Sequence, residues 1–149
     1  MASPARFPLT GGEYVEYQAR LDGHLPLTQR IRGAVGAGDI PQHRLYRYTN
    51  DHTMAGSAVE LAGHGLDVDG VSWYVDQPDW LARPALGIPA IPGIAILVEA
   101  GGVFSAGAVL QSDANGRAIQ RTTGVGVLRA LQAASNAGDL VVAVFLSGR

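Results

Sequence analysis

The chain contains no cysteine and no lysine. Without cysteine there is no disulfide, no thiolate metal ligand and no cysteine nucleophile, and the redox compartment stays undetermined. All 11 basic residues are arginine, and with 13 acidic residues they give a net charge of −2. These charges are spread along the chain and form no basic run, so the pattern argues against a nucleic-acid partner.

Long apolar segments are also absent. The longest apolar stretches, Ile94–Val98 and Leu140–Leu146, are far short of the roughly 20 residues that cross a bilayer. The amino terminus lacks the apolar core of a secretion signal. We therefore expect no membrane partner and a chain made in a cytoplasm.

What remains is enough for one hydrophobic core. The 149 residues are 47% hydrophobic, the size and composition of one ordinary domain. Twenty glycines and 8 prolines interrupt the sequence, which leaves little room for long helices and favours short strands joined by turns. The sequence predicts a mainly β fold, a small β-barrel or sandwich of short strands with at most one or two short helices.

Two proline-rich segments organise this domain. Residues 1–12 are rich in proline and glycine and are predicted to form an extended N-terminal arm, followed by a single β-rich domain over residues 13–149. The prolines of residues 83–93 predict a rigid, extended connector. This connector marks a change in sequence pattern within that domain. Just before it, Asp76 is suited to cap one helical turn.

Strand patterns recur between the turns. Asn115-Gly116 predicts a tight hairpin because both positions accept a positive φ, and Trp73 is predicted to be core. Two segments are ambiguous between strand and short helix, namely Pro26–Val35 and Val125–Ser135. The predicted strands are Glu13–Leu21, His43–Thr49, Val59–Ala62, Val71–Val75, Ile94–Ala100 and Leu140–Leu146.

Residues suited to catalysis or metal binding do not form a recognised pattern. The four histidines lack the short spacing of a zinc motif. The segment Asp67–Gly70 is similar to the start of a calcium loop, but the glycine comes too early and the later glutamate is missing. No Gly-x-Ser-x-Gly motif frames a serine. We predict no enzyme, no metal and no cofactor.

One strand carries candidate contact residues. Alternation along His43–Thr49 places Arg44, Tyr46 and Tyr48 on one strand face. Arginine and tyrosine are favoured at the energetic centres of protein interfaces, so these three are predicted to contact a partner. The alternative for this strand is a solvated edge strand with amphipathic side chains. The high arginine content of the whole chain also has an alternative explanation, namely codon bias.

A series of weak motifs gains specificity from its order. It comprises Glu99–Gly101, then Ala106–Leu110, then the turn Ser112–Ala118, a Gly-Val-x-x-Ala-x-x-Ala-Ala segment near Gly126–Ala134, and Ala137–Val141 before the last strand. Over residues 96–146, about a third of the chain, this order resembles the capsid cement, or head decoration, proteins of tailed bacteriophages. Residues 1–93 depart from the compact form of that family.

The resemblance implies a non-enzymatic virion protein on the outer surface of the assembled head. Such proteins commonly form homotrimers and contact several subunits of the major capsid protein, cementing them together. In the predicted arm, Arg6 and Phe7 are the expected anchors on the shell. The alternatives are another virion module, such as a tail or spike base, and a small β-barrel enzyme or ligand-binding domain using His43, His52 or His64.

Overall fold

The computed structural model describes residues 29–33, 40–53, 56–74 and 85–147. These residues form β-strands joined by turns and contain no helix. The strands are β1 (Gln29–Gly33), β2 (Leu45–Thr53), β3 (Gly56–Leu61), β4 (Gly70–Tyr74), β5 (Ala85–Pro89), β6 (Ala95–Glu99), β7 (Val109–Ser112), β8 (Ala118–Gln120), β9 (Leu128–Ala130) and β10 (Leu140–Phe145).

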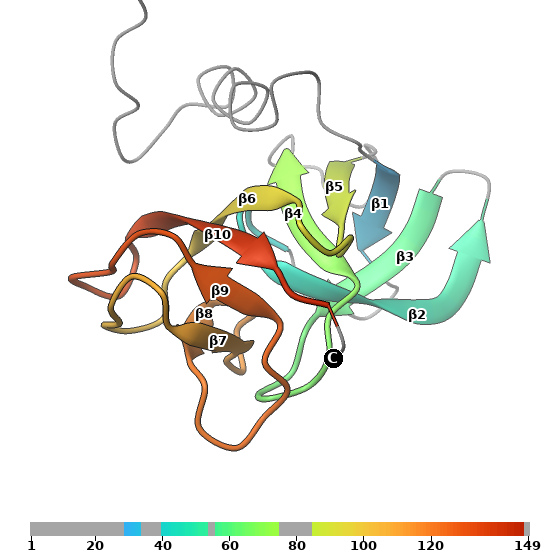
Figure 1. The fold of residues 1–149 in the computed structure, drawn as a ribbon. Helices are drawn as coiled ribbons and strands as arrows, with labels where there is room; N and C mark the ends of the chain where they lie inside the picture. Colours follow the sequence, from blue (N-terminus) through green and yellow to red (C-terminus); the bar gives the residue numbers. More distant parts are fainter. Residues whose placement is uncertain (1–28, 34–39, 54–55, 75–84, 148–149) are drawn as a thin grey trace, which may run out of the picture.

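The first five strands close into a small barrel in the order β1-β3-β2-β4-β5 (Figure 1). Strand β1 completes the barrel because it pairs in parallel with β3 on one side and antiparallel with β5 on the other. The remaining pairs in the barrel are antiparallel. Closure satisfies the backbone groups that open edge strands would expose.

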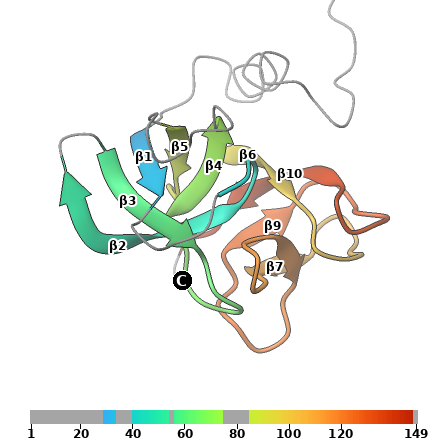
Figure 2. The same ribbon diagram turned by 180° about the vertical axis from the view of Figure 1, so that it is seen from behind.

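The last five strands form a second, antiparallel sheet in the order β6-β10-β9-β7-β8. An isolated bridge between Ala100 and Ala118 brings the end of β6 to the start of β8, so the two edges of this sheet meet at one point. Figure 2 shows the sheet beside the barrel, seen from behind. The sheet is therefore strongly curved and partly closed on itself.

The main hydrophobic core lies between the barrel and the second sheet. Barrel residues such as Leu45, Val71 and Ile88 belong to the same buried cluster as Leu97 and Phe145 of the second sheet. A smaller cluster fills the barrel itself and consists of Ile31, Ile40, Tyr46 and Val59. The shared core makes the two halves parts of one packed unit.

The all-β fold class is confirmed, as are several local predictions. The predicted hairpin turn at Asn115-Gly116 is present between the antiparallel strands β7 and β8, with Gly116 at a φ of 72°, whereas Asn115 does not have a positive φ. Trp73 is buried. Strand β10 lies between β6 and β9, as its continuous apolar sequence predicts for an interior strand. Of the two ambiguous segments, one contains β1 and the other β9.

Within the predicted extended connector over residues 83–93, residues 85–89 are a paired strand of the barrel and not a connector. Residues Ala85–Pro89 form β5, which pairs with both β1 and β4 and so closes the barrel. Proline is tolerated here because Pro89 is the last residue of the strand. The arm over residues 1–12, the strand over Glu13–Leu21 and the turn capped by Asp76 lie outside the described residues.

Tyr46 is inside the barrel, so the prediction that its side chain is displayed on the surface is wrong. Its exposed fraction is 0%. The ring fits because glycines face it: a Cβ on Gly87 would lie 2.5 Å from the Tyr46 hydroxyl oxygen, and one on Gly70 would lie closer still. Leu45, which precedes Tyr46 on β2, is also buried but belongs to the main core. Both faces of β2 are therefore covered where the strand begins.

Replacing Gly87 by alanine tests this packing. The added methyl group would overlap the Tyr46 ring, and overpacking of this kind lowers the free energy of unfolding by about 1–3 kcal/mol. Gly102→Ala is the matched control, because a Cβ at Gly102 meets no atom within 4 Å, and its effect should stay within about 0.5 kcal/mol. Urea unfolding of the two variants gives the comparison, and equal stabilities would contradict the packing.

Candidate functional site

The short segment at the start of β2 joins the barrel to the second sheet through its backbone. The amide of Leu45 donates to the carbonyl of Gly116 at 2.7 Å, and the amide of Glu99 donates to the carbonyl of His43 at 3.0 Å. One bond reaches the β7–β8 turn and the other reaches the end of β6. We call the segment His43–Leu45 the joint.

Arg44 strengthens the joint with its side chain. Its guanidinium Nη2 lies 2.9 Å from Glu99 Oε2, and Nη1 donates to the carbonyl of Asn115 at 3.0 Å. Glu99 also receives a second, longer ion pair from Arg117 Nη1 at 3.7 Å. Arg44 and Glu99 are only 16% and 21% exposed, so their charges are partly shielded from water and screened less than a surface pair.

The Asn115-Gly116 turn is shaped to fit the joint. Asp113 Oδ1 accepts hydrogen bonds from the amides of Asn115 at 2.8 Å and Arg117 at 2.9 Å, which fixes the turn. A Cβ on Gly116 would lie 2.6 Å from the Leu45 carbonyl oxygen, so only glycine allows this approach. The hairpin turn is thus a docking element within the chain.

His43 is the buried titratable group of the joint. Its backbone amide donates to the Ser72 carbonyl at 2.7 Å, and its φ is 65°. The side chain of Ser72 is likewise buried, accepts from the Arg44 amide at 3.0 Å and donates to the Pro41 carbonyl at 2.6 Å. Burial, and secondly the charge of Arg44, lower the pKa of His43 to about 4.

The structure does not bring the sequence-predicted contact residues together on one surface. Arg44 is engaged in the joint and Tyr46 fills the barrel. Tyr48 is 37% exposed, and its hydroxyl donates to Gln29 Oε1 at 2.8 Å, while the Gln29 Nε2 donates to Tyr46 at 2.5 Å. Burial raises the pKa of the Tyr46 phenol above its usual range. The predicted anchors Arg6 and Phe7 lie outside the described residues.

Sequence reasoning missed the role of Glu99, Asp113 and Arg117 in joining the two halves. The available signal was Arg117 at the end of the segment Asp113–Arg117, because a simple hairpin turn does not require arginine at that position. Glu99 is the last residue of strand β6, whose three central residues are buried, and its partner Arg44 lies 55 residues away in sequence. No local pattern predicts a contact over that separation.

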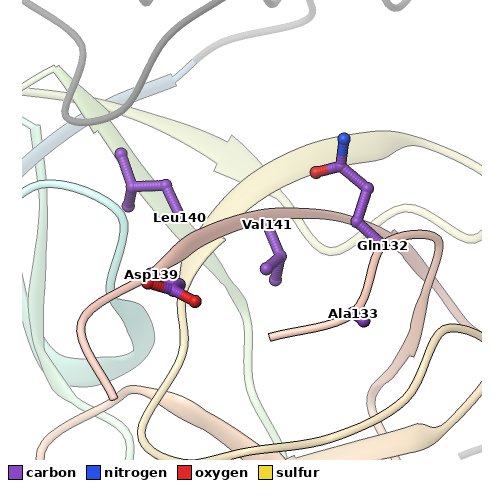
Figure 3. Close-up of a pocket in the computed structure, with 5 residues that line it drawn as sticks. All are labelled: Gln132, Ala133, Asp139, Leu140 and Val141. Atoms are coloured by element: carbon purple, nitrogen blue, oxygen red, sulfur yellow. The ribbon is translucent and has the colours of Figure 1, made fainter. Parts of the chain in front are cut away.

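An open groove of about 390 Å³ borders the beginning of β10 (Figure 3). Gln132 and Leu140 project to one side of the chain there and Val141 to the other. Two polar groups that line the groove accept hydrogen bonds from backbone amides: Gln132 Oε1 accepts from the Val142 amide at 3.0 Å, and Asp139 Oδ2 accepts from the Ser135 amide at 2.9 Å. The groove therefore presents apolar and polar atoms together, including the Asp139 carboxylate.

A second open groove, of about 560 Å³, lies beside the loop of residues 121–126. Its charged group is Arg121, whose Nε donates to the Gly124 carbonyl at 2.7 Å. Across the described ranges, no three histidine or acidic residues gather in a group that could hold a metal ion. Within those same ranges, no helix has the length and apolar character to span a membrane.

Comparison with known proteins gives a likeness in fold. No protein-family profile matches the chain. No curated protein matches it either. Among solved structures, the chain is similar to the one described as head fiber gp8.5 N base in bacteriophage phi29, with a TM-score of 0.54 and 19% identity, covering 80% of this chain and 91% of that one. At this identity the likeness shows the fold.

Acid should destabilise the fold through His43. The unfolded chain takes up a proton near the ordinary pKa of 6.5, whereas the folded chain does so only near 4. The free energy of unfolding therefore falls by about 3 kcal/mol as the pH drops from about 6.5 to about 4, and this contribution is constant below that range. Unfolding curves of the wild type and of His43→Asn, which tolerates positive φ, should differ in slope across this window.

The exposed His64 supplies the control for this prediction. His64→Asn removes an exposed histidine that lies outside the joint and should keep the acid sensitivity of the wild type. A parallel pH dependence in wild type and His43→Asn would show that His43 does not cause the acid sensitivity.

Glu99→Gln tests the ion pairs of the joint. The substitution removes the charge that Arg44 and Arg117 share and should lower the free energy of unfolding by about 1–2 kcal/mol. Glu60→Gln is the matched control, since Glu60 pairs with Arg47 at 2.6 Å on the exposed surface and should cost at most about 0.5 kcal/mol. Equal losses in denaturant unfolding would contradict a special role for the joint.

Proposed function

We propose that this protein is a non-enzymatic structural protein of a tailed-phage virion, bound to the outer surface of the assembled head. There it cements neighbouring subunits of the major capsid protein and stabilises the shell. The observation that carries this proposal is the likeness in fold to the base of a phage head fibre. The ordered motifs of residues 96–146, which resemble head decoration proteins, support it independently.

The physical mechanism is preferential binding to the assembled shell. A protein that binds the assembled head and not the free subunits stabilises the assembled state by mass action. A homotrimer bound across several subunits gains further strength, because its second and third contacts form within one complex. Each single contact then needs only modest affinity.

The joint suits such a role because it fixes the shape of the binding body. Backbone bonds and the Arg44–Glu99 pair hold the barrel and the second sheet in one arrangement before any partner is met. A surface that is already ordered loses less conformational entropy on binding, which leaves more of the contact energy for affinity. The residues that anchor the protein to the shell are proposed to include Arg6, Phe7 and Tyr48.

Co-sedimentation with phage heads tests the proposal. The full chain should pellet with heads assembled from the major capsid protein of its own phage, should stay in solution with unassembled subunits, and should raise the temperature at which the heads disassemble. Removal of residues 2–12 should abolish pelleting while leaving the unfolding curve of the chain unchanged. Binding to neither form of the capsid protein would reject the cementing function.

The same experiment separates cementing from a second candidate, the anchoring base of a longer head appendage. That candidate is favoured by the 91% coverage of the head fibre base. A base that only anchors a fibre and binds within a single capsid subunit would bind heads and free subunits alike and would leave the disassembly temperature unchanged, whereas a cement binds across subunits and must raise it. Electron microscopy of the decorated heads then shows whether the bound chain bridges capsid subunits.

A further inference from the structure

Two irregular segments run side by side along one end of the second sheet. Residues 100–108 lie antiparallel to residues 130–138, joined by the Phe104–Ala134 bridge and by bonds from the Gly107 amide to the Ala130 carbonyl at 2.7 Å and from the Gly138 amide to the Ala100 carbonyl at 2.8 Å. We call these two segments the neutral ridge. Figures 1 and 2 show it at the end of the molecule turned away from β1 and β3.

The ridge carries no charged residue in either segment. It holds the two most exposed large hydrophobic side chains among the described residues, Val103 at 69% and Leu131 at 51%. The carboxylate of Asp139, at its border, accepts hydrogen bonds from the amides of Ser135 at 2.9 Å and Asn136 at 3.0 Å, so this charge is used within the turn. The other exposed side chains of the ridge are small or uncharged: Ser105, Ala106, Gln132, Ala133, Ser135, Asn136 and Ala137.

The absence of charge indicates which surface fits the ridge. Burying a charged surface against a neutral one removes water from the charges without giving them partners, which is unfavourable. Other exposed parts of the described surface carry charges, for example Arg47, Asp67 and Arg121. Among the described residues, Ile91 and Pro92 are also exposed and uncharged, but their stretch is shorter, so the ridge of a second copy offers the more extensive uncharged match. Its alanine and serine side chains also lose little rotamer entropy when they are buried.

We propose that copies of this chain associate with one another through the neutral ridge, with Val103 and Leu131 at the centre of the contact. At a rotation axis every copy presents the same residues, so an uncharged surface meets its equivalents without repulsion between like charges. This deepens the proposed function by assigning the surface that builds the homotrimer. Its biological setting rests on that function, while the association is measurable on the free protein.

Sedimentation of the full chain over a range of concentrations is the first test. The wild type should form an oligomer, and Leu131→Glu should weaken self-association by at least about tenfold, because each copy would bury an unpaired carboxylate. Leu66→Glu is the matched control: Leu66 is 46% exposed on the loop between β3 and β4 and should leave self-association unchanged. Thermal unfolding verifies that both variants fold.

The absence of cysteine allows a second, independent measurement. With Val103→Cys as the only thiol in the chain, a short bis-maleimide should link copies to one another in high yield, whereas Leu66→Cys should give little linkage under the same conditions. A monomeric wild type, an unchanged oligomer in Leu131→Glu, or equal cross-linking at the two positions would each overturn the inference.

Binding to heads distinguishes this inference from the proposed function. If Leu131→Glu keeps its oligomer but no longer binds heads, the ridge faces the shell, the inference is overturned and the proposed function stands. If copies associate through the ridge but never bind heads, the inference holds and the cementing function is rejected.

Discussion

The contact at the start of β2 fixes how the barrel and the second sheet are arranged. There the backbone of His43 and Leu45 bonds to Glu99 and Gly116, and the Arg44 guanidinium bonds to both a carboxylate and a turn carbonyl. The main core alone would favour contact between the two halves but not one orientation, because burial of apolar surface has no direction. Hydrogen bonds and ion pairs supply the direction.

This arrangement has a consequence for stability. The joint places His43 and a partly shielded ion pair where they cannot be fully hydrated, and the lowered pKa of His43 records that burial. Buried polar groups contribute to one specific arrangement only while all their partners are present. The fold is therefore expected to be most sensitive at the joint, both to acid and to loss of one charge.

The two surfaces proposed for binding lie outside the joint and differ in chemistry. The neutral ridge is uncharged and made of small side chains, which suits contact between identical copies. Tyr48, beside the buried Tyr46 with ring centroids 6.2 Å apart, offers a partly exposed aromatic side chain, and its backbone amide donates to the carboxylate of Asp69. Under the proposed function, the first surface would contact other copies of the chain and the second would contact capsid subunits.

By itself, the sequence determined the all-β class, the Asn115-Gly116 turn and the interior strand β10, because glycine and proline spacing, turn chemistry and continuous apolar runs act over a few residues. Only the tertiary structure decided that Tyr46 is buried, that residues 85–89 close the barrel and that Arg44 meets Glu99. Alternation shows which residues share a face of β2 but not what covers that face. Contacts between distant segments depend on the path of the whole chain, which no local pattern contains.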